Sequence, residues 1–146
     1  MSRIRIPVLF ACLAISTLNL IAQEHDLPDG VQVRRIWSNG KYNAFTSLID
    51  FNGTLYCAFR EGESHVFGRD GVTRIISSED GLKWDPVAVL TKDGYDLRDP
   101  KLSVTPDGRI MVVIGGSVYK GQELLSRLTH VSFSDRSGRN FSSCRS

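Results

Sequence analysis

Short hydrophobic segments separated by turn sequences make up most of the chain after about residue 30. No window keeps apolar residues at positions i, i+3, i+4 and i+7 for more than about two helical turns, so the pattern does not favour helices. Turn residues instead recur at intervals of about 8–12 residues, a spacing typical of β-sandwiches, β-barrels and β-propellers. The hydrophobic pattern therefore predicts an all-β fold.

The clearest local prediction is a β-hairpin. Residues 44–51 and residues 54–60 are rich in apolar and β-branched side chains, and Asn52-Gly53 joins them. This dipeptide accepts positive φ at both central positions of a two-residue turn, which is the turn that matches the twist of paired strands. Further strands are expected at residues 72–78, 87–91, 101–104, 109–116 and 128–134.

The turn residues repeat along the chain. Gly53 and Gly108 end hairpin turns that lie 55 residues apart, and Gly81 and Gly138 lie 57 residues apart. A repeated unit of this length with about four strands is typical of a propeller blade. The alternative is a β-sandwich whose hairpins resemble one another by chance. The matched order of the turns favours the propeller.

One turn sequence fits a known pattern. Residues 77–84 (SSEDGLKW) match the Asp-box, Ser-x-Asp-x-Gly-x-x-Trp, with Glu79 at the Asp position. A degenerate copy at residues 134–141 (SDRSGRNF) has Arg136 at that position and Phe141 in place of Trp. In such a turn, an acid and a serine bind backbone groups, glycine takes a left-handed conformation, and the aromatic ring covers the turn. The motif is therefore expected to be structural.

On these motifs and their spacing, residues 30–146 resemble the sialidase superfamily of Asp-box propellers. The resemblance implies a six-bladed all-β ring, of which about two blades are present here. Blade one would span about residues 30–93, and an incomplete blade two would span about residues 94–146. The implied function is that of an exo-sialidase, which hydrolyses a terminal glycosidic bond in a glycan or glycoconjugate. This chain would be a truncated form of such an enzyme and inactive alone. A non-catalytic glycan-binding module and a non-functional gene fragment are the alternatives.

The resemblance also implies site residues. Sialidases hold the substrate carboxylate with three arginines and use an Asp as acid/base and a Tyr–Glu pair as nucleophile. The first arginine position falls on Asn43, which cannot supply a guanidinium fork, and this counts against ordinary sialidase activity. Asp70 lies near the acid/base position, although a turn Asp in an Asp-Gly pair explains it equally well.

Four further residues are candidates for substrate binding. Arg60 and Glu61 end a strand and open a charged loop that could border the channel mouth. Arg98 and Asp99 open the inner strand of blade two, one blade along from Asn43 at the same channel end. They are either a substrate clamp with a carboxylate or a salt bridge that fixes the strand entry.

Composition narrows the function classes. The net charge is +2, and beyond residue 22 the charges balance, which argues against nucleic-acid binding. Residues 1–22 read as a signal peptide with Arg3 and Arg5 before an apolar run of about 15 residues, short of the about 20 that span a membrane. We therefore expect a secreted or periplasmic protein without a span after cleavage. A membrane anchor and a lipoprotein signal at Cys12 are less favoured.

The sequence predicts no cofactor and no metal site. The histidines at positions 25, 65 and 130 are far apart and have no zinc-type spacing. Cys57 lies within an apolar strand segment, where a buried free thiol is the expected state.

Overall fold

The computed structural model describes residues 28–40, 42–66 and 71–146. The predicted signal peptide, residues 1–22, and Asp70 lie outside the described residues. The chain divides into two units, residues 1–33 and residues 34–146, and every strand lies in the second.

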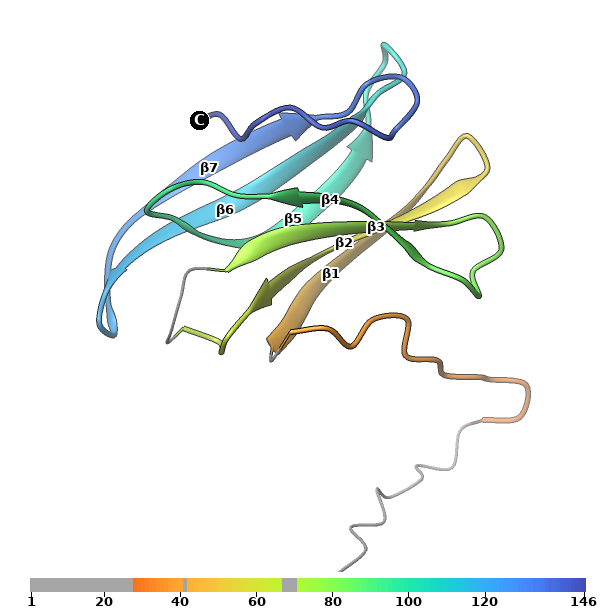
Figure 1. Ribbon diagram of the computed structural model, residues 1–146, viewed down its shortest axis with the longest axis horizontal. Coiled ribbons are helices and arrows are strands. Elements are labelled where there is room, and N and C mark those ends of the chain that lie inside the picture. The colour runs from red at the N-terminus through yellow and green to blue at the C-terminus, as the bar shows by residue number, and fades with distance from the viewer. Residues whose placement is uncertain (1–27, 41, 67–70) are drawn as a thin grey trace, which may run out of the picture. The chain divides into compact units, whose positions relative to one another are not determined.

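The second unit consists of two antiparallel sheets (Figure 1). The first sheet has the order β1-β2-β3-β4 and the second has the order β5-β6-β7. The described residues contain no helix, so the all-β prediction is confirmed, and the two sheets are propeller-type blades. A ring of six blades stays a prediction, as do the blade boundaries. The strands are β1 (Tyr42–Phe51), β2 (Thr54–Gly62), β3 (Val72–Ser78), β4 (Asp85–Leu90), β5 (Asp96–Val104), β6 (Ile110–Lys120) and β7 (Glu123–Phe133).

The predicted hairpins form, and the strands expected at residues 109–116 and 128–134 are joined in a further, longer hairpin. Asn52 (φ 56°) and Gly53 (φ 80°) make the two-residue turn between β1 and β2. The β6–β7 pair extends to Lys120 and Glu123 around Gly121. The sequence analysis missed this extension because the added residues are largely polar or exposed and show no strand-like alternation.

Both inner strands carry a β-bulge at the same place. The register of β1 shifts between Ala44 and Ser47, and that of β5 shifts between Arg98 and Lys101. Each bulge holds a non-glycine residue in the left-handed region: Phe45 (φ 62°) in β1 and Asp99 (φ 51°) in β5. An L side chain is unfavourable in this conformation, so the surrounding packing must enforce it.

The bulges correct one detail of the sequence prediction. They align Arg98 with Ala44, one residue after Asn43, which was the predicted equivalent. Pro100 lies inside the bulge of β5. A bulge leaves one residue unpaired, so it accommodates a residue that has no N–H.

Two hydrophobic clusters hold the sheets. The larger lies between the two sheets, where Ala58 and Ile75 of the first meet Leu97, Val112 and Ile114 of the second. The smaller covers the opposite face of the first sheet and contains Cys57, Phe59 and Ile76, with Trp37 and Trp84 packed against it. Cys57 is a buried free thiol as predicted, and burial raises its pKa.

The Asp-box turn forms with a different acid from the predicted one. The Asp80 carboxylate accepts hydrogen bonds from the backbone N–H groups of Leu82 (2.8 Å) and Lys83 (2.9 Å), which lower its pKa. The Ser78 hydroxyl accepts one from the Gly81 N–H (2.8 Å). Glu79 occupies the Asp position of the Asp-box motif, but it is the neighbouring Asp80 that accepts the hydrogen bonds from these backbone N–H groups. The turn in the second sheet uses Asp135 in the same way.

The turn chemistry gives the first testable prediction. Replacing Asp80 with Ala should lower the free energy of unfolding, because two backbone N–H groups lose their acceptor. Glu79→Ala is the matched control and should leave stability nearly unchanged. Urea denaturation of both variants measures the difference. Equal destabilisation by the two substitutions would show that Asp80 is not the acid that closes the turn.

His130 gives the second prediction. Its ring is 1% exposed, and neither nitrogen has a hydrogen-bond partner. Burial, with a smaller contribution from the charge of Lys92, lowers the pKa of His130. The imidazole therefore binds a proton more readily in the unfolded chain than in the folded one. The free energy of unfolding should be at its full value above about pH 6.5 and decrease as the pH falls below it. His130→Leu should flatten this dependence in urea denaturation between pH 7 and pH 5. An unchanged pH slope would contradict the assignment.

Candidate functional site

A buried group of charges joins the two sheets. Asp96, 2% exposed at the start of β5, accepts hydrogen bonds from Arg60 of β2 and Arg98 of β5. Arg60 donates from Nε to Oδ1 (2.9 Å), and its Nη2 forms an ion pair with the same oxygen (2.8 Å). Arg98 donates from Nε (3.1 Å) and Nη2 (2.5 Å) to Oδ2. The backbone N–H of Gly71 also donates to Oδ1 (2.7 Å). We call Arg60, Asp96 and Arg98 the arginine cluster.

The arginine cluster carries one more positive than negative charge. Arg60 is 1% exposed and Arg98 is 8% exposed, so both guanidinium groups depend on Asp96 for compensation. A glycine at position 71 is required here, because a Cβ would lie 2.6 Å from Asp96 Oδ1 and closer still to Arg60 Nε. Breaking a buried ion pair by removing one partner is strongly destabilising. The cluster is therefore a structural link between the blades.

The cluster also holds the loop after β2. Arg60 Nη1 donates to the carbonyl oxygen of Ser64 (2.7 Å), and Arg98 Nη2 donates to that of His65 (2.7 Å). Both interactions are hydrogen bonds from a charged donor, which are stronger than those between neutral groups. The backbone at residues 64–65 is thus tied to the junction of the two sheets.

Aromatic side chains surround the cluster. The Arg60 guanidinium lies 5.7 Å from the ring centroid of Tyr42. The Arg98 guanidinium lies 5.9 Å from the ring of Phe45 and 5.5 Å from that of Tyr119. The His65 ring contacts both Tyr42 and Phe45 edge-on. We call Tyr42, Phe45, His65 and Tyr119 the aromatic rim.

A hollow of about 290 Å³ opens beside Arg98. Asp99 is exposed at its edge, and Gly115, Gly116 and Ser117 form part of its wall. Of the Arg98 donors, Nη1 has no hydrogen-bond partner among residues 28–40, 42–66 and 71–146. The exposed side chains of Arg127 and Thr129 line it as well. The hollow therefore offers guanidinium groups, one carboxylate and hydroxyl groups, the few polar groups that a small-molecule site requires.

The structure divides the predicted site residues into two groups on different faces of the sheets. It brings Arg60 and Arg98 together, and Asp99 borders the same hollow as Arg98. Glu61 and Asn43 are paired on adjacent strands and lie on the opposite face of the first sheet from Arg60. Asn43 donates to the carbonyl of Asn39 (2.8 Å).

Glu61 forms a structural ion pair. Its carboxylate accepts two hydrogen bonds from Arg74, each 2.8 Å, and one from the Trp37 indole (3.0 Å). The hydrogen bonds from Arg74 lower the pKa of Glu61, and the single hydrogen bond from Trp37 lowers it to a smaller extent. Residues Glu61 and Asn43 therefore help to attach residues 37–39 to the first sheet, away from the arginine cluster.

Sequence reasoning missed the centre of the site. Asp96 lies two residues before Arg98, which was a candidate for substrate binding. A carboxylate so close to a candidate arginine could have indicated an ion pair. Tyr42 and Tyr119 gave no signal, because only the folded sheets bring them to the cluster. The described residues contain no group of three or more His, Cys, Asp or Glu side chains that could hold a metal ion. They also include no helix long and apolar enough to cross a membrane.

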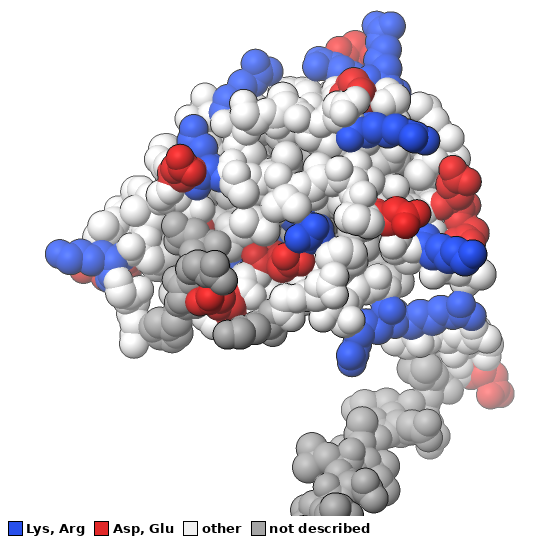
Figure 2. All heavy atoms as spheres, in the orientation of Figure 1, with Lys and Arg blue, Asp and Glu red and all other residues white. Residues whose placement is uncertain are grey.

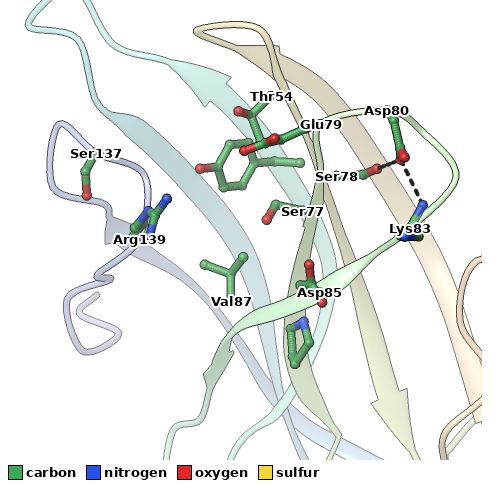
Figure 3. A pocket seen from close by; sticks show the side chains of 12 residues that line it. Thr54, Ser77, Ser78, Glu79, Asp80, Lys83, Asp85, Val87, Ser137 and Arg139 are labelled. Atoms are coloured by element: carbon green, nitrogen blue, oxygen red, sulfur yellow. Dashed lines mark hydrogen bonds between the residues drawn. The ribbon is translucent and has the colours of Figure 1, made fainter.

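A larger hollow, of about 570 Å³, lies at the Asp-box turns. Figure 3 shows Ser137 and Arg139 of the second sheet facing Ser77 and Asp85 of the first across this space. Several of its polar groups are already bound within the turn, including Asp80 and Ser78. Its one aromatic lining residue, Tyr56, is 5% exposed and therefore presents little surface to a ligand. We therefore favour the smaller hollow beside the aromatic rim as the ligand site.

Charges of both signs are mixed on the face of the molecule shown in Figure 2. Positive and negative side chains alternate over the face shown in Figure 2 and do not form a basic patch. Nucleic-acid binding sites concentrate lysine and arginine on one face. The distribution agrees with the balanced charge of the sequence beyond residue 22.

The solved structures that this chain resembles include two glycoside hydrolases. A glycosyl hydrolase from Bacteroides ovatus is similar over 69% of this chain and 30% of its own, with a TM-score of 0.51 and 16% identity. A member of the GH130 family of mannoside phosphorylases and glycoside hydrolases, which targets β-1,2 mannosidic linkages in Candida mannan, is similar over 70% of this chain and 31% of its own, with a TM-score of 0.51 and 14% identity. No family model and no curated protein matches the sequence.

These comparisons concern the fold. The chain spans less than a third of the length of either structure. Both are glycosidase propellers, which supports the propeller interpretation of the two sheets. The similarity to sialidases in particular stays a prediction.

The arginine cluster yields the third prediction. Asp96→Asn should lower the free energy of unfolding by about 3–5 kcal/mol, because it leaves two buried guanidinium groups without a carboxylate. Asp99→Asn is the control. It removes a carboxylate from the same strand at an exposed position, and Asn tolerates the left-handed conformation. Chemical denaturation followed by tryptophan fluorescence measures both. A loss below about 1 kcal/mol for Asp96→Asn would show that the cluster does not join the sheets.

Proposed function

We propose that residues 34–146 form two blades of an exported glycan-binding propeller related to glycoside hydrolases. The ligand site is the hollow beside Arg98. The observation that carries this proposal is the combination of Arg98, Asp99 and Ser117 around one hollow. The guanidinium of Arg98 also lies within 6 Å of two rings of the aromatic rim, those of Phe45 (5.9 Å) and Tyr119 (5.5 Å). Aromatic rings pack against the apolar face of a sugar, and polar groups bind its hydroxyls.

Binding is better supported than hydrolysis for this chain. Glycosidases use two carboxylates, about 5–9.5 Å apart, on either side of the scissile bond. Among the described residues that line the hollow, Asp99 is the only carboxylate. The nearby Asp96 is fully engaged by two arginines and a backbone N–H. Hydrolysis would need a second acid from outside these residues.

The ligand is proposed to be a neutral saccharide. A substrate carboxylate is held best by two N–H groups of one guanidinium, acting as a fork. In Arg98, Nε and Nη2 already bind Asp96, and Nη2 also binds the His65 carbonyl, so only Nη1 remains. Arg60 is buried. Among the described residues the cluster therefore offers a single nitrogen, which suits a hydroxyl better than a carboxylate. Arg127 adds an exposed guanidinium to the same hollow, and it can donate to a sugar hydroxyl as well.

Sialoside hydrolysis is the second candidate function. It is favoured by the convergence of two arginines, Arg60 and Arg98, at one end of the sheets. It also agrees with the Asp-box motifs. A fluorogenic sialoside that is cleaved by the full chain would establish it over simple binding.

The fourth prediction tests the site. We expect the full chain to bind β-1,2-mannobiose more tightly than 3′-sialyllactose in NMR titrations. Asp99→Asn should weaken mannobiose binding at least about tenfold, since it replaces a charged acceptor by a neutral one. Arg136→Gln, an exposed residue of the second turn, is the matched control and should bind normally.

The outcome also separates the two hollows. Arg139→Gln alters the hollow at the Asp-box turns and leaves the one beside Arg98 intact. A loss of binding in Arg139→Gln with none in Asp99→Asn would move the site to the turns. Absence of saturable binding by either saccharide would contradict the proposal that the chain binds glycans.

A further inference from the structure

We propose that Gly115 is the residue that admits a saccharide ring to the hollow beside Arg98, and that the ligand, not the fold, requires its missing side chain. The inference rests on the proposed glycan binding and identifies the position that determines which ligands fit. Gly115 lies in β6, the middle strand of the second sheet, and borders the hollow. A glycine inside a strand weakens it, so a specific reason for its presence is expected.

The backbone conformation does not require a glycine at this position. The described glycines that have positive φ do not include Gly115. Its neighbours in the sheet are Arg98 of β5 and Thr129 of β7, so it lies in a regular antiparallel ladder on both sides. Any L-residue adopts the extended conformation of such a ladder without strain.

The packing does not require a glycine either. Within 4 Å, a Cβ atom added to Gly115 would meet the Arg98 carbonyl oxygen at 3.4 Å and the Arg98 Cγ at 3.8 Å. Both are ordinary van der Waals distances. The adjacent Gly116 is different, because a Cβ there would lie 2.5 Å from the ring of His130. The core therefore requires Gly116 and leaves Gly115 free to vary.

The bulge of β5 does not explain Gly115. Glycine often marks a bulge, and Gly115 pairs with Arg98 at the edge of this one. The first sheet has the same bulge in β1, where the corresponding pair is Ala44 and Arg60. The bulge thus forms with a full-sized side chain at the position of Gly115. The remaining role for the glycine is to keep the hollow open.

Polar side chains lie on each side of the space that Gly115 leaves. Arg98, Gly115 and Thr129 are paired in one row across the three strands, so they share a face of the sheet. Neighbouring strands are about 4.8 Å apart, which places Arg98 and Thr129 one strand spacing to either side of the glycine. Ser117, two residues along β6, is paired with Arg127 on the same face. All of these residues line the hollow.

This arrangement suits a saccharide ring. A glycine backbone allows a ligand to approach more closely than any residue with a Cβ does. Hydroxyl groups of the sugar can then pair with the exposed Thr129 hydroxyl and Arg127 guanidinium, which between them offer donors and an acceptor. A methyl group at position 115 would occupy the place of the ring.

The experiment fills this place in the full chain. Gly115→Ala should weaken binding of β-1,2-mannobiose at least about tenfold, because the added methyl group overlaps the ligand. Gly115→Val should weaken it further. Ser126→Thr is the matched control, since it adds a methyl group at an exposed position of β7 outside the hollow and should bind normally. NMR titration measures each affinity.

Stability is measured on the same variants by urea denaturation. Gly115→Ala should unfold at the same urea concentration as the unmodified chain or at a higher one, because alanine is favoured over glycine in a strand and fits here without a clash. A glycine required by the fold would give the opposite sign. The two measurements therefore separate a ligand requirement from a structural one.

Chemical-shift changes locate the sugar independently of the variants. In the unmodified chain, the amide signals of Gly115, Gly116 and Thr129 should shift as mannobiose is added, because these residues line the hollow. Gly108, in the turn between β5 and β6, is the internal control and should not shift.

The failures are distinguishable. If Gly115→Ala binds mannobiose as tightly as the unmodified chain while Asp99→Asn still weakens binding, Gly115 does not control entry, although the proposed function stands. If Gly115→Ala lowers the free energy of unfolding, the fold requires the glycine and the inference is wrong. If neither mannobiose nor 3′-sialyllactose binds the unmodified chain, the proposed function fails and this inference fails with it.

Discussion

The carboxylate of Asp96 is the constraint on which the junction of the two blades depends. It accepts hydrogen bonds from an arginine of each sheet and from the Gly71 backbone, all within a region that excludes water. Two buried guanidinium groups without it would repel one another and lose their solvation. The hydrophobic cluster between the sheets buries apolar surface and so stabilises their contact. The hydrogen bonds of Asp96 fix how the start of β5 is placed against β2.

The same bonds connect structure to the proposed function. Arg60 and Arg98 use their remaining donors on the backbone of Ser64 and His65, so the loop after β2 is ordered by the blade junction. The arginines that sequence reasoning assigned to a substrate are thus occupied within the protein; among the residues that the structure describes, one nitrogen of Arg98 has no partner. For Arg98 the sequence left two roles open, a substrate clamp and a salt bridge at the start of the strand. Most of its observed interactions fit the salt bridge.

The sequence was sufficient for the elements and insufficient for the site. Asn52-Gly53 and the glycine repeat predicted the hairpins and the blade-like units, because turn chemistry is local. The bulges at Phe45 and Asp99 were missed, since an extra residue in a strand leaves no mark in the hydrophobic pattern. The loop between β5 and β6 is longer than the two-residue turn between β1 and β2, so the match of Gly53 with Gly108 paired Asn43 with the wrong position of β5. The pairing of Tyr42 with His65 required the fold.

The aligned bulges also show how one backbone position came to serve two purposes. Ala44 pairs with Arg60 in the first sheet, and its equivalent, Arg98, pairs with Gly115 in the second. Arg60 and Gly115 are therefore counterparts: one fills its space with a guanidinium, while the other has no side chain and borders the hollow. A repeated scaffold can thus acquire a cavity through divergence of its copies, without any change in backbone, when one copy keeps a large residue and its twin becomes glycine.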